Sequence, residues 1–230
     1  MDYEEAPRIG AFLFDVNLNR MKELRQQFIK SLSTNQQNFD ISLTEQKQNA
    51  LADYYELVLK HNEILHLVAP CSPEEFAVRH ILESLTLLKF LPKNAKFADI
   101  GTGAGLPSIP CLIVREDLRG VLIESKLKKV SFLHEVLADC KLENRAEILD
   151  RQFEELSQPN VSFILCRALD KFTQKLPKLL KWSGDCNLLF FGGNNLREEL
   201  KKNGVEFQEQ LMPLSEQRFL FASLLQKKSV

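Results

Sequence analysis

The apolar positions along the chain follow two different spacings, and the change falls near residue 95. Before it, apolar side chains recur at the three- and four-residue intervals of amphipathic helices. After it, short apolar runs alternate with helical patterns, which is typical of strands joined by helices. The sequence therefore predicts a helical section followed by an α/β section.

Three helices are predicted in the N-terminal section. Their apolar positions are Phe12, Leu13, Val16, Met21, Leu24, Phe28 and Leu32 in the first helix, Ala50, Leu51, Tyr54, Leu57 and Val58 in the second, and Ile81, Leu85 and Leu88 in the third. The polar stretch 33–38 is predicted to be a linker, and Ser42-Leu43-Thr44-Glu45 has the pattern of a capping box for the second helix. Prolines 70 and 73 break the pattern, and the third helix is expected over residues 74–90.

The α/β section contains seven predicted strands, at residues 96–100, 120–124, 145–149, 161–166, 186–191, 205–211 and 217–225. Helical patterns separate the first five, and right-handed crossovers then place these strands parallel in one sheet. Only residues 212–217 separate the last two strands, which predicts an antiparallel hairpin. The expected fold class is α/β: a Rossmann-like, seven-stranded, mostly parallel sheet with a terminal antiparallel hairpin, as in class I methyltransferases, preceded by an N-terminal helical section.

A glycine-rich loop follows the first predicted strand. Asp99 stands two residues before Gly101, and Gly103 and Gly105 follow at alternate positions. Glycine accepts positive φ and lets the backbone approach a ligand, because it has no Cβ atom. Ligands of open α/β sheets bind at the carboxyl ends of the strands, so this loop is a candidate nucleoside site. A turn whose glycines serve only packing is the alternative.

The chemistry around the loop favours one kind of nucleoside. Glu124 ends the second predicted strand, where a carboxylate can accept both ribose hydroxyls; such charged hydrogen bonds contribute roughly 1.5–3 kcal/mol. The third glycine comes one residue earlier than in the G-x-G-x-x-G pattern of dinucleotide-binding proteins. Pro107 and Pro110 also remove two backbone donors from the next helix. The loop is thus a poor phosphate cradle, and S-adenosylmethionine, with its ribose, adenine and sulfonium, fits it better.

Composition narrows the possible classes of function. The chain has 230 residues, with 30 Lys and Arg against 31 Asp and Glu, so any RNA contact must come from a local patch. No run approaches the roughly 18 apolar residues of a transmembrane helix, and the acidic N-terminus lacks a signal-peptide pattern. The five cysteines form no C-x-x-C pair, which argues against a zinc site or a disulfide framework. We expect a cytoplasmic protein with no metal and no membrane partner.

Several motifs together resemble one known family. They are Arg79-His80-Ile81-Leu82-Glu83-Ser84-Leu85, Asp99-Ile-Gly-Thr-Gly-Ala-Gly-Leu-Pro-Ser-Ile-Pro110, Lys128-Lys129-Val-Ser-Phe-Leu133, Leu142-Glu143-Asn144 and Cys166-Arg167-Ala168. From about residue 42 to the C-terminus, the chain resembles the glucose-inhibited division protein B family, whose members are small-subunit ribosomal RNA methyltransferases G. The G-T-G-x-G-L-P-x-I-P string with R-H-I-L-x-S upstream is specific, and few other methyltransferases carry it.

The resemblance implies S-adenosylmethionine-dependent methylation of N7 of a guanine in small-subunit (16S) ribosomal RNA. The partner would be this RNA or the small ribosomal subunit, with no DNA, and we expect a monomer. The implied cofactor-binding residues are Asp99, Gly101, Gly103, Gly105, Leu106, Glu124, Phe153, Glu154 and Arg167. Glu124 would bind the ribose, Phe153 and Glu154 would flank the adenine, and Arg167 would be the catalytic residue facing the methyl-transfer site.

RNA contacts are expected near the same site. The candidate RNA-binding residues are Arg79, His80, Lys126, Lys128 and Lys129, together with Arg167. Ser125 is expected to cap the helix that carries the lysines. A solvated helix face is the alternative for the lysines, and a hydrogen-bonded structural histidine is the alternative for His80.

The chain is expected to divide into three parts, and it differs from the family pattern at several positions. We expect an N-terminal helical extension over residues 1–40, a helical subdomain over 41–92 and an S-adenosylmethionine-binding methyltransferase domain over 93–230. His66-Leu67-Val68 stands where the family has Asn-Leu-Thr, and Glu83 and Glu124 stand where it has Asp. Gly192-Gly193 stands where the family has Lys-Gly, so a lysine is missing.

The alternatives belong to other functional classes. A Rossmann dinucleotide oxidoreductase is disfavoured by the early third glycine, the prolines and the terminal hairpin. A non-catalytic ribosome-binding or RNA-binding protein that retains the fold is suggested by the departures from the family. A small-molecule methyltransferase of the same fold would leave the helix with Arg79 and His80 unexplained.

Overall fold

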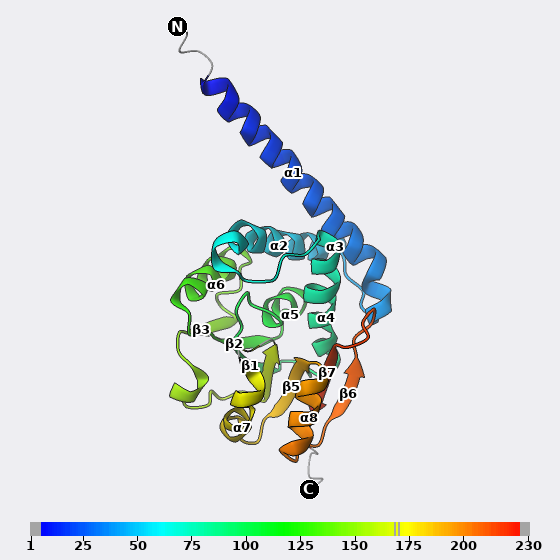
Figure 1. Ribbon diagram of the computed structural model, residues 1–230, viewed down its shortest axis with the longest axis vertical. Coiled ribbons are helices and arrows are strands. Elements are labelled where there is room, and N and C mark those ends of the chain that lie inside the picture. Colours follow the sequence, from blue (N-terminus) through cyan, green and yellow to red (C-terminus); the bar gives the residue numbers. More distant parts are fainter. Residues whose placement is uncertain (1–5, 168, 170, 226–230) are drawn as a thin grey trace.

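A computed structural model describes residues 6–167, 169 and 171–225, with side chains from residue 19 onward. Its centre is a seven-stranded sheet (Figure 1). The strands are β1 (Lys96–Ile100), β2 (Arg119–Ile123), β3 (Ala146–Leu149), β4 (Phe163–Arg167), β5 (Asn187–Gly192), β6 (Gln208–Leu211) and β7 (Phe219–Ser223). Their order is β3-β2-β1-β4-β5-β7-β6.

The pairing of the strands confirms the predicted fold class. Strands β1 to β5 are parallel, and β7 is antiparallel to both β5 and β6. The chain order reverses between β1 and β4, which is the switch point where open sheets bind ligands. Ile100 at the end of β1 pairs with Ile123 of β2 and with Cys166 of β4, so these strand ends lie side by side.

Helices cover both faces of the sheet because successive strand side chains point to opposite faces. On β1, Phe97 belongs to the core under α5 (Ser108–Val114) and α6 (Leu127–Asp139). Its neighbour Ala98 belongs to the core under α7 (Phe172–Ser183) and α8 (Asn194–Lys202). The parallel strands are therefore buried on both faces, as their apolar runs predicted.

The N-terminal helical section packs against the first of these cores. It consists of α1 (Ala6–Asn35), η1 (Gln36–Phe39), α2 (Glu45–Leu65) and a continuous helical segment formed by α3 (Pro73–Glu75), η2 (Phe76–Leu82), α4 (Glu83–Leu85) and η3 (Thr86–Lys89). Figure 1 shows that the N-terminal half of α1 projects away from the rest of the molecule. The C-terminal half packs on the other helices, and the buried Phe28 ring stacks on Tyr55 with centroids 4.5 Å apart.

Two local predictions for this section are wrong. The stretch 33–38 is helical rather than a linker, because the Ser33 and Thr34 hydroxyls bond to carbonyls four residues earlier and Gln36 accepts from the Leu43 amide. The N-cap of α2 is Thr44, not Ser42, since the Thr44 hydroxyl accepts from the Lys47 amide. Phe12, Leu13 and Val16 lie outside the residues with described side chains. The proposed division at residues 40 and 92 stays a prediction.

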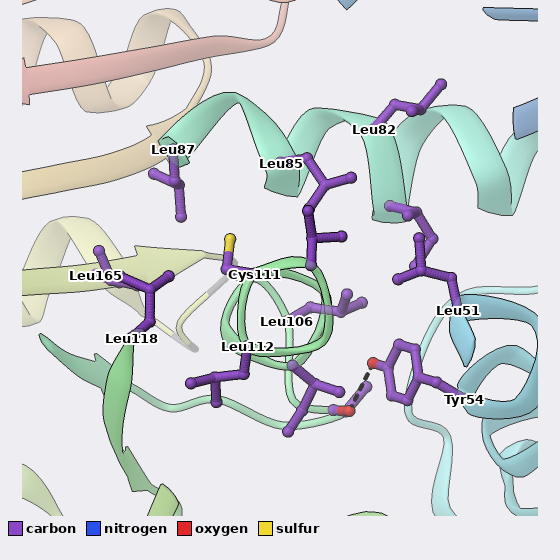
Figure 2. Close-up of a cluster of buried hydrophobic side chains, with 14 of the residues drawn as sticks. Leu51, Tyr54, Leu82, Leu85, Leu87, Leu106, Cys111, Leu112, Leu118 and Leu165 are labelled. Carbon is purple, nitrogen blue, oxygen red and sulfur yellow. Dashed lines mark hydrogen bonds between the residues drawn. The ribbon is translucent and has the colours of Figure 1, made fainter. Parts of the chain in front are cut away.

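A buried tyrosine joins the helical section to the glycine loop. The hydroxyl of Tyr54 on α2 donates to the carbonyl oxygen of Ala104 at 2.8 Å. Figure 2 shows this bond beside leucines from α2, the helical segment and α5. Because Tyr54 has no exposed surface, neither group has water as an alternative partner. The position of the loop therefore depends on a residue 50 positions earlier in the chain.

We expect Tyr54→Phe to lower the free energy of unfolding by about 1–3 kcal/mol. The change removes one donor and leaves the Ala104 carbonyl buried without it. Urea denaturation followed by the fluorescence of the single tryptophan measures the effect. Tyr55→Phe, a change of a neighbouring buried ring, is the comparison. Equal and negligible losses in both variants would show that the bond to Ala104 has no role in stability.

Candidate functional site

A cavity of about 580 Å³ lies at the carboxyl ends of β1, β2 and β4. It is lined by the glycine loop, the end of β2, the loop after β3, the end of β4 and the segment after α2. The lining residues are Leu67, Val68, Ala69, His80, Ile100, Gly101, Thr102, Gly103, Ala104, Leu106, Ile123, Glu124, Ser125, Lys126, Lys129, Arg151, Gln152, Phe153, Glu154, Arg167, Leu169 and Lys175. Its size and its place at the switch point are those of a small-molecule site.

The three glycines of the loop differ in the contacts that an added side chain would make. Gly101, Gly103 and Gly105 have φ values of +66°, +59° and +90°. A Cβ atom on Gly101 would lie 2.5 Å from Leu169, and one on Gly105 would lie 2.4 Å from Ile109. On Gly103 it would meet nothing closer than the Gly101 carbonyl at 3.7 Å. Gly101 and Gly105 are thus required for packing, whereas Gly103 keeps the cavity wall free of a side chain.

Glu124 ties the end of β2 to this loop. One carboxylate oxygen accepts from the Gly103 amide at 3.1 Å, and the other accepts from the Lys126 amide at 2.8 Å. Each oxygen keeps a second lone pair, so the carboxylate can still accept ligand hydroxyls. Ser125 does not cap α6 as predicted: Lys126 is the N-cap without a side-chain bond, and Glu124 satisfies its amide.

Asp99 lies beneath the loop rather than on the cavity wall. It has no exposed surface and accepts hydrogen bonds from the hydroxyls of Thr102 and Ser108. Burial raises the pKa of the Asp99 carboxyl to about 7, because the surroundings disfavour its charged form. Its position supports a role in holding the loop.

The raised pKa of Asp99 predicts a pH-dependent stability. Between pH 4 and pH 7 the folded protein holds a proton at Asp99 that the unfolded chain has released. This contribution to stability is complete below pH 4 and is lost as the pH rises through about 7. We expect Asp99→Asn to remove the dependence. Urea denaturation at pH 5 and pH 7 measures it, and parallel pH profiles of the two proteins would contradict the assignment.

His80 changes the stability with pH in the direction opposite to Asp99, so the wild type has to be compared with Asp99→Asn. Burial and the neighbouring arginines lower the pKa of His80 to about 3, so folding favours its neutral form. Its contribution to stability therefore grows as the pH rises from 3 to about 6.5. Only the difference between wild type and Asp99→Asn isolates the aspartate.

Basic side chains surround the cavity. The cationic ones in its lining are Lys126, Lys129, Arg151, Arg167 and Lys175, the acidic ones are Glu124 and Glu154, and His80 lines it in its neutral form. Sequence reasoning missed Arg151 and Lys175. Arg151 follows β3 by two residues, a place where open sheets bind ligands, and this spacing was the available signal. Lys175 lies on α7, with Nζ 3.8 Å from Glu154 Oε1, and no sequence pattern marks it.

A buried ion-pair network fixes Arg167. Glu83 is 1% exposed, and it pairs with Arg167 at 3.2 Å and with Arg218 at 2.7 Å. The Arg167 guanidinium also donates to the Arg79 carbonyl at 2.6 Å and lies 5.2 Å from the centre of the Phe191 ring. Arg167 is therefore held at the cavity by contacts from distant parts of the chain.

The structure brings most of the predicted site residues together. Those in the cavity lining are Gly101, Gly103, Leu106, Glu124, Phe153, Glu154, Arg167, His80, Lys126 and Lys129. Asp99, Gly105, Arg79 and Lys128 are outside it. Arg79 pairs with Glu75 on its own helix, and Lys128 is exposed on the first turn of α6. The binding roles of all these residues stay predictions.

The helices in the described part of the chain are too short or too polar for any of them to cross a membrane. Within the same residues, no three His, Cys, Asp or Glu side chains are grouped as metal ligands.

Comparisons with known proteins agree with this architecture. Curated proteins named ribosomal RNA small subunit methyltransferase G match from Desulforamulus reducens (39% identity over 139 residues, 57% of this chain and 58% of that protein) and from Escherichia coli (38% over 128 residues, 56% and 61%). The chain thus aligns with about six tenths of the length of these relatives. A SAM-dependent methyltransferase structure from Aquifex aeolicus is similar in fold (TM-score 0.52, 17% identity, 66% of this chain and 93% of that one).

A family model covers a longer part of the chain than either relative. The model, described as GidB, rRNA small subunit methyltransferase G, matches residues 47–222. This range includes nearly all of α2, the glycine loop, every strand of the sheet except the last residue of β7, and all residues of the cavity lining. The chain therefore belongs to the GidB family.

Proposed function

We propose that the protein transfers a methyl group from S-adenosylmethionine to N7 of a guanine in small-subunit ribosomal RNA. The observation that carries the proposal is the lining of one cavity. It combines Gly103, which has no side chain, and the acidic Glu124 with several basic side chains. The first pair suits a ribose-bearing cation, and the basic side chains suit a polyanionic substrate. Membership of the GidB family supports both parts.

The residues present fit S-adenosylmethionine better than a dinucleotide. A Cβ atom on Gly103 would enter the space between Gly101 and Lys129, which both line the cavity, so its absence leaves room for a ligand. Glu124 would accept ribose hydroxyls, and Phe153 and Glu154 would lie beside the adenine. Helix α5 begins with Pro107 as its N-cap and contains Pro110, so it offers few amides to a pyrophosphate.

The chain's own residues have little proton chemistry to perform. The bound cofactor supplies an electrophilic methyl group. Guanine N7 has a lone pair and no proton, so the protein needs no general base to create a nucleophile. Its contribution is to orient the purine and the cofactor, with Arg167 fixed at the cavity by Glu83 and Phe191.

Methyl transfer to defined RNA tests the proposal. Purified protein is incubated with labelled S-adenosylmethionine and either deproteinised small-subunit RNA or small subunits from a strain lacking the gene. We expect one labelled N7-methylguanine, mapped by cleavage at that base. Label on another base or on a protein would refute the assignment. RNA binding without transfer would instead favour a non-catalytic RNA-binding protein.

A further inference from the structure

Two large apolar side chains lie on the surface with most of their area exposed, although burial would be favourable for them. Ile64 is 74% exposed and Leu127 is 68% exposed, the two highest values for large apolar residues in the described part of the chain. Leu127 is the first residue of α6, and Ile64 lies in the last turn of α2. Ile64 is also out of phase with the buried positions of α2, such as Leu51 and Val58.

The two side chains lie at the same end of a helix pair. Lys60 and His61 on α2 both pair with Glu135 on α6, at 2.8 and 2.9 Å. The His61 ring also contacts Phe132, with ring centres 5.4 Å apart. Earlier on α2, Tyr54 lies near Cys140, which follows the last residue of α6, so the two helices run antiparallel. The stretch of α2 from Lys60 to Ile64 therefore runs toward the first turn of α6, which begins with Leu127. Figure 1 shows the C-terminal end of α2 next to α6.

This end of the helix pair forms a rim of the cavity. Lys126 and Lys129, on either side of Leu127 in sequence, line the cavity. Leu67, Val68 and Ala69, which follow Ile64 after the end of α2, line it as well. We call Ile64, Leu127, Lys126 and Lys128 the rim patch.

The charges around the rim patch match a nucleic acid. Among the described residues, no carboxylate lies within ion-pair distance of Lys126, Lys128 or Lys129. Phosphates are the usual partners of such lysines. Leucine and isoleucine side chains are inserted against partly unstacked bases in other nucleic-acid complexes. Two exposed apolar side chains beside lysines without carboxylate partners are therefore better suited to bind RNA than to bind an uncharged protein surface.

We propose that the rim patch binds the RNA nucleotide next to the guanine that enters the cavity, with Leu127 and Ile64 against its base and Lys126 and Lys128 against phosphates. The contact replaces the stacking that this neighbour loses when the target guanine leaves the RNA stack. The inference rests on the proposed function, because it takes the cavity as the guanine site.

Equilibrium binding of deproteinised small-subunit RNA, in the presence of S-adenosylhomocysteine, tests the proposal without requiring methyl transfer. We expect Leu127→Ala to raise the Kd about tenfold and Ile64→Ala about threefold. Leu127→Met keeps the apolar volume and should bind within about twofold of wild type. Melting temperatures should not change, since both side chains are exposed.

Salt dependence separates the two kinds of contact. Lys128→Ala should lower the slope of log Kd against log salt by about 0.7, because one phosphate contact is lost. Leu127→Ala should leave that slope unchanged. Leu225→Ala is the matched control, since Leu225 is 54% exposed and its amide bonds to Asn187 at the start of β5, away from the carboxyl ends of the strands. Its affinity should equal that of wild type.

Two results would overturn the proposal. They are unchanged affinity of both Leu127→Ala and Ile64→Ala for deproteinised RNA and for small subunits, and no measurable binding of the wild type to either. Leu127-dependent RNA binding by a protein that transfers no methyl group would refute the proposed function but support the rim patch.

Discussion

Replacing Gly103 with alanine is expected to weaken S-adenosylhomocysteine binding at least about tenfold while the protein stays folded. The new methyl group would enter the cavity between Gly101 and Lys129 without a clash inside the protein, since its nearest neighbour is 3.7 Å away. It would keep a ligand from the Gly103 backbone, and losing one such contact costs about tenfold in affinity. Isothermal titration calorimetry measures the effect.

The chain offers a matched control for backbone strain. Gly204, after α8, has φ of +70°, and a methyl group added there would meet nothing within 4 Å. Gly204→Ala therefore carries the same left-handed strain of roughly 1–2 kcal/mol. It lies outside the cavity lining and should bind the ligand like wild type. Gly103→Ala with unaltered affinity would show that the ligand does not approach this part of the loop.

Replacing Glu83 with alanine should destabilise the protein by about 3–5 kcal/mol. The change leaves the largely buried Arg167 without its carboxylate partner and also removes the partner of the half-buried Arg218. We also expect slower methyl transfer, because Arg167 loses the ion pair that orients it at the cavity. Urea denaturation followed by the fluorescence of Trp182 measures the first effect, and single-turnover transfer measures the second.

An exposed pair on the same helical segment provides the comparison. Glu75 pairs with Arg79 four residues later, and both side chains are about two-fifths exposed. Glu75→Ala should therefore cost less than about 0.5 kcal/mol. If Glu83→Ala cost no more than Glu75→Ala, the buried network would have no special weight in the stability of the fold.

The sheet was predictable because its signals are local. Most strands are short apolar runs, and the observed bounds differ from the predicted ones by a few residues at most. The largest difference is at the polar β6, which begins at Gln208 instead of residue 205. The linker prediction for residues 33–38 failed because the polar side chains there bond within the helix and to Leu43. Their composition alone cannot distinguish these bonds from contact with water.

The site was predictable where it follows a strand end and not where it depends on distant contacts. The glycine loop and Glu124 follow β1 and β2 directly, so parallel pairing brings them together. Lys175 reaches the cavity from α7, and Arg218 meets Glu83 across 135 positions of chain. No spacing rule describes such pairs, because they arise only when the helices have packed on the sheet.

Because Tyr54 on α2 bonds to Ala104 in the glycine loop, we expect that the α/β section from residue 93 onward cannot keep its loop in place without the N-terminal helices. A fragment beginning at residue 93 would uncover the face of α5 on which the helical segment 73–89 now packs, including Cys111, whose thiol lies 3.3 Å from the Ser84 carbonyl oxygen. It would also lose the only tyrosine hydroxyl that holds the loop among the described residues. Grafting this pocket onto another scaffold would have to include α2 and the helical segment 73–89.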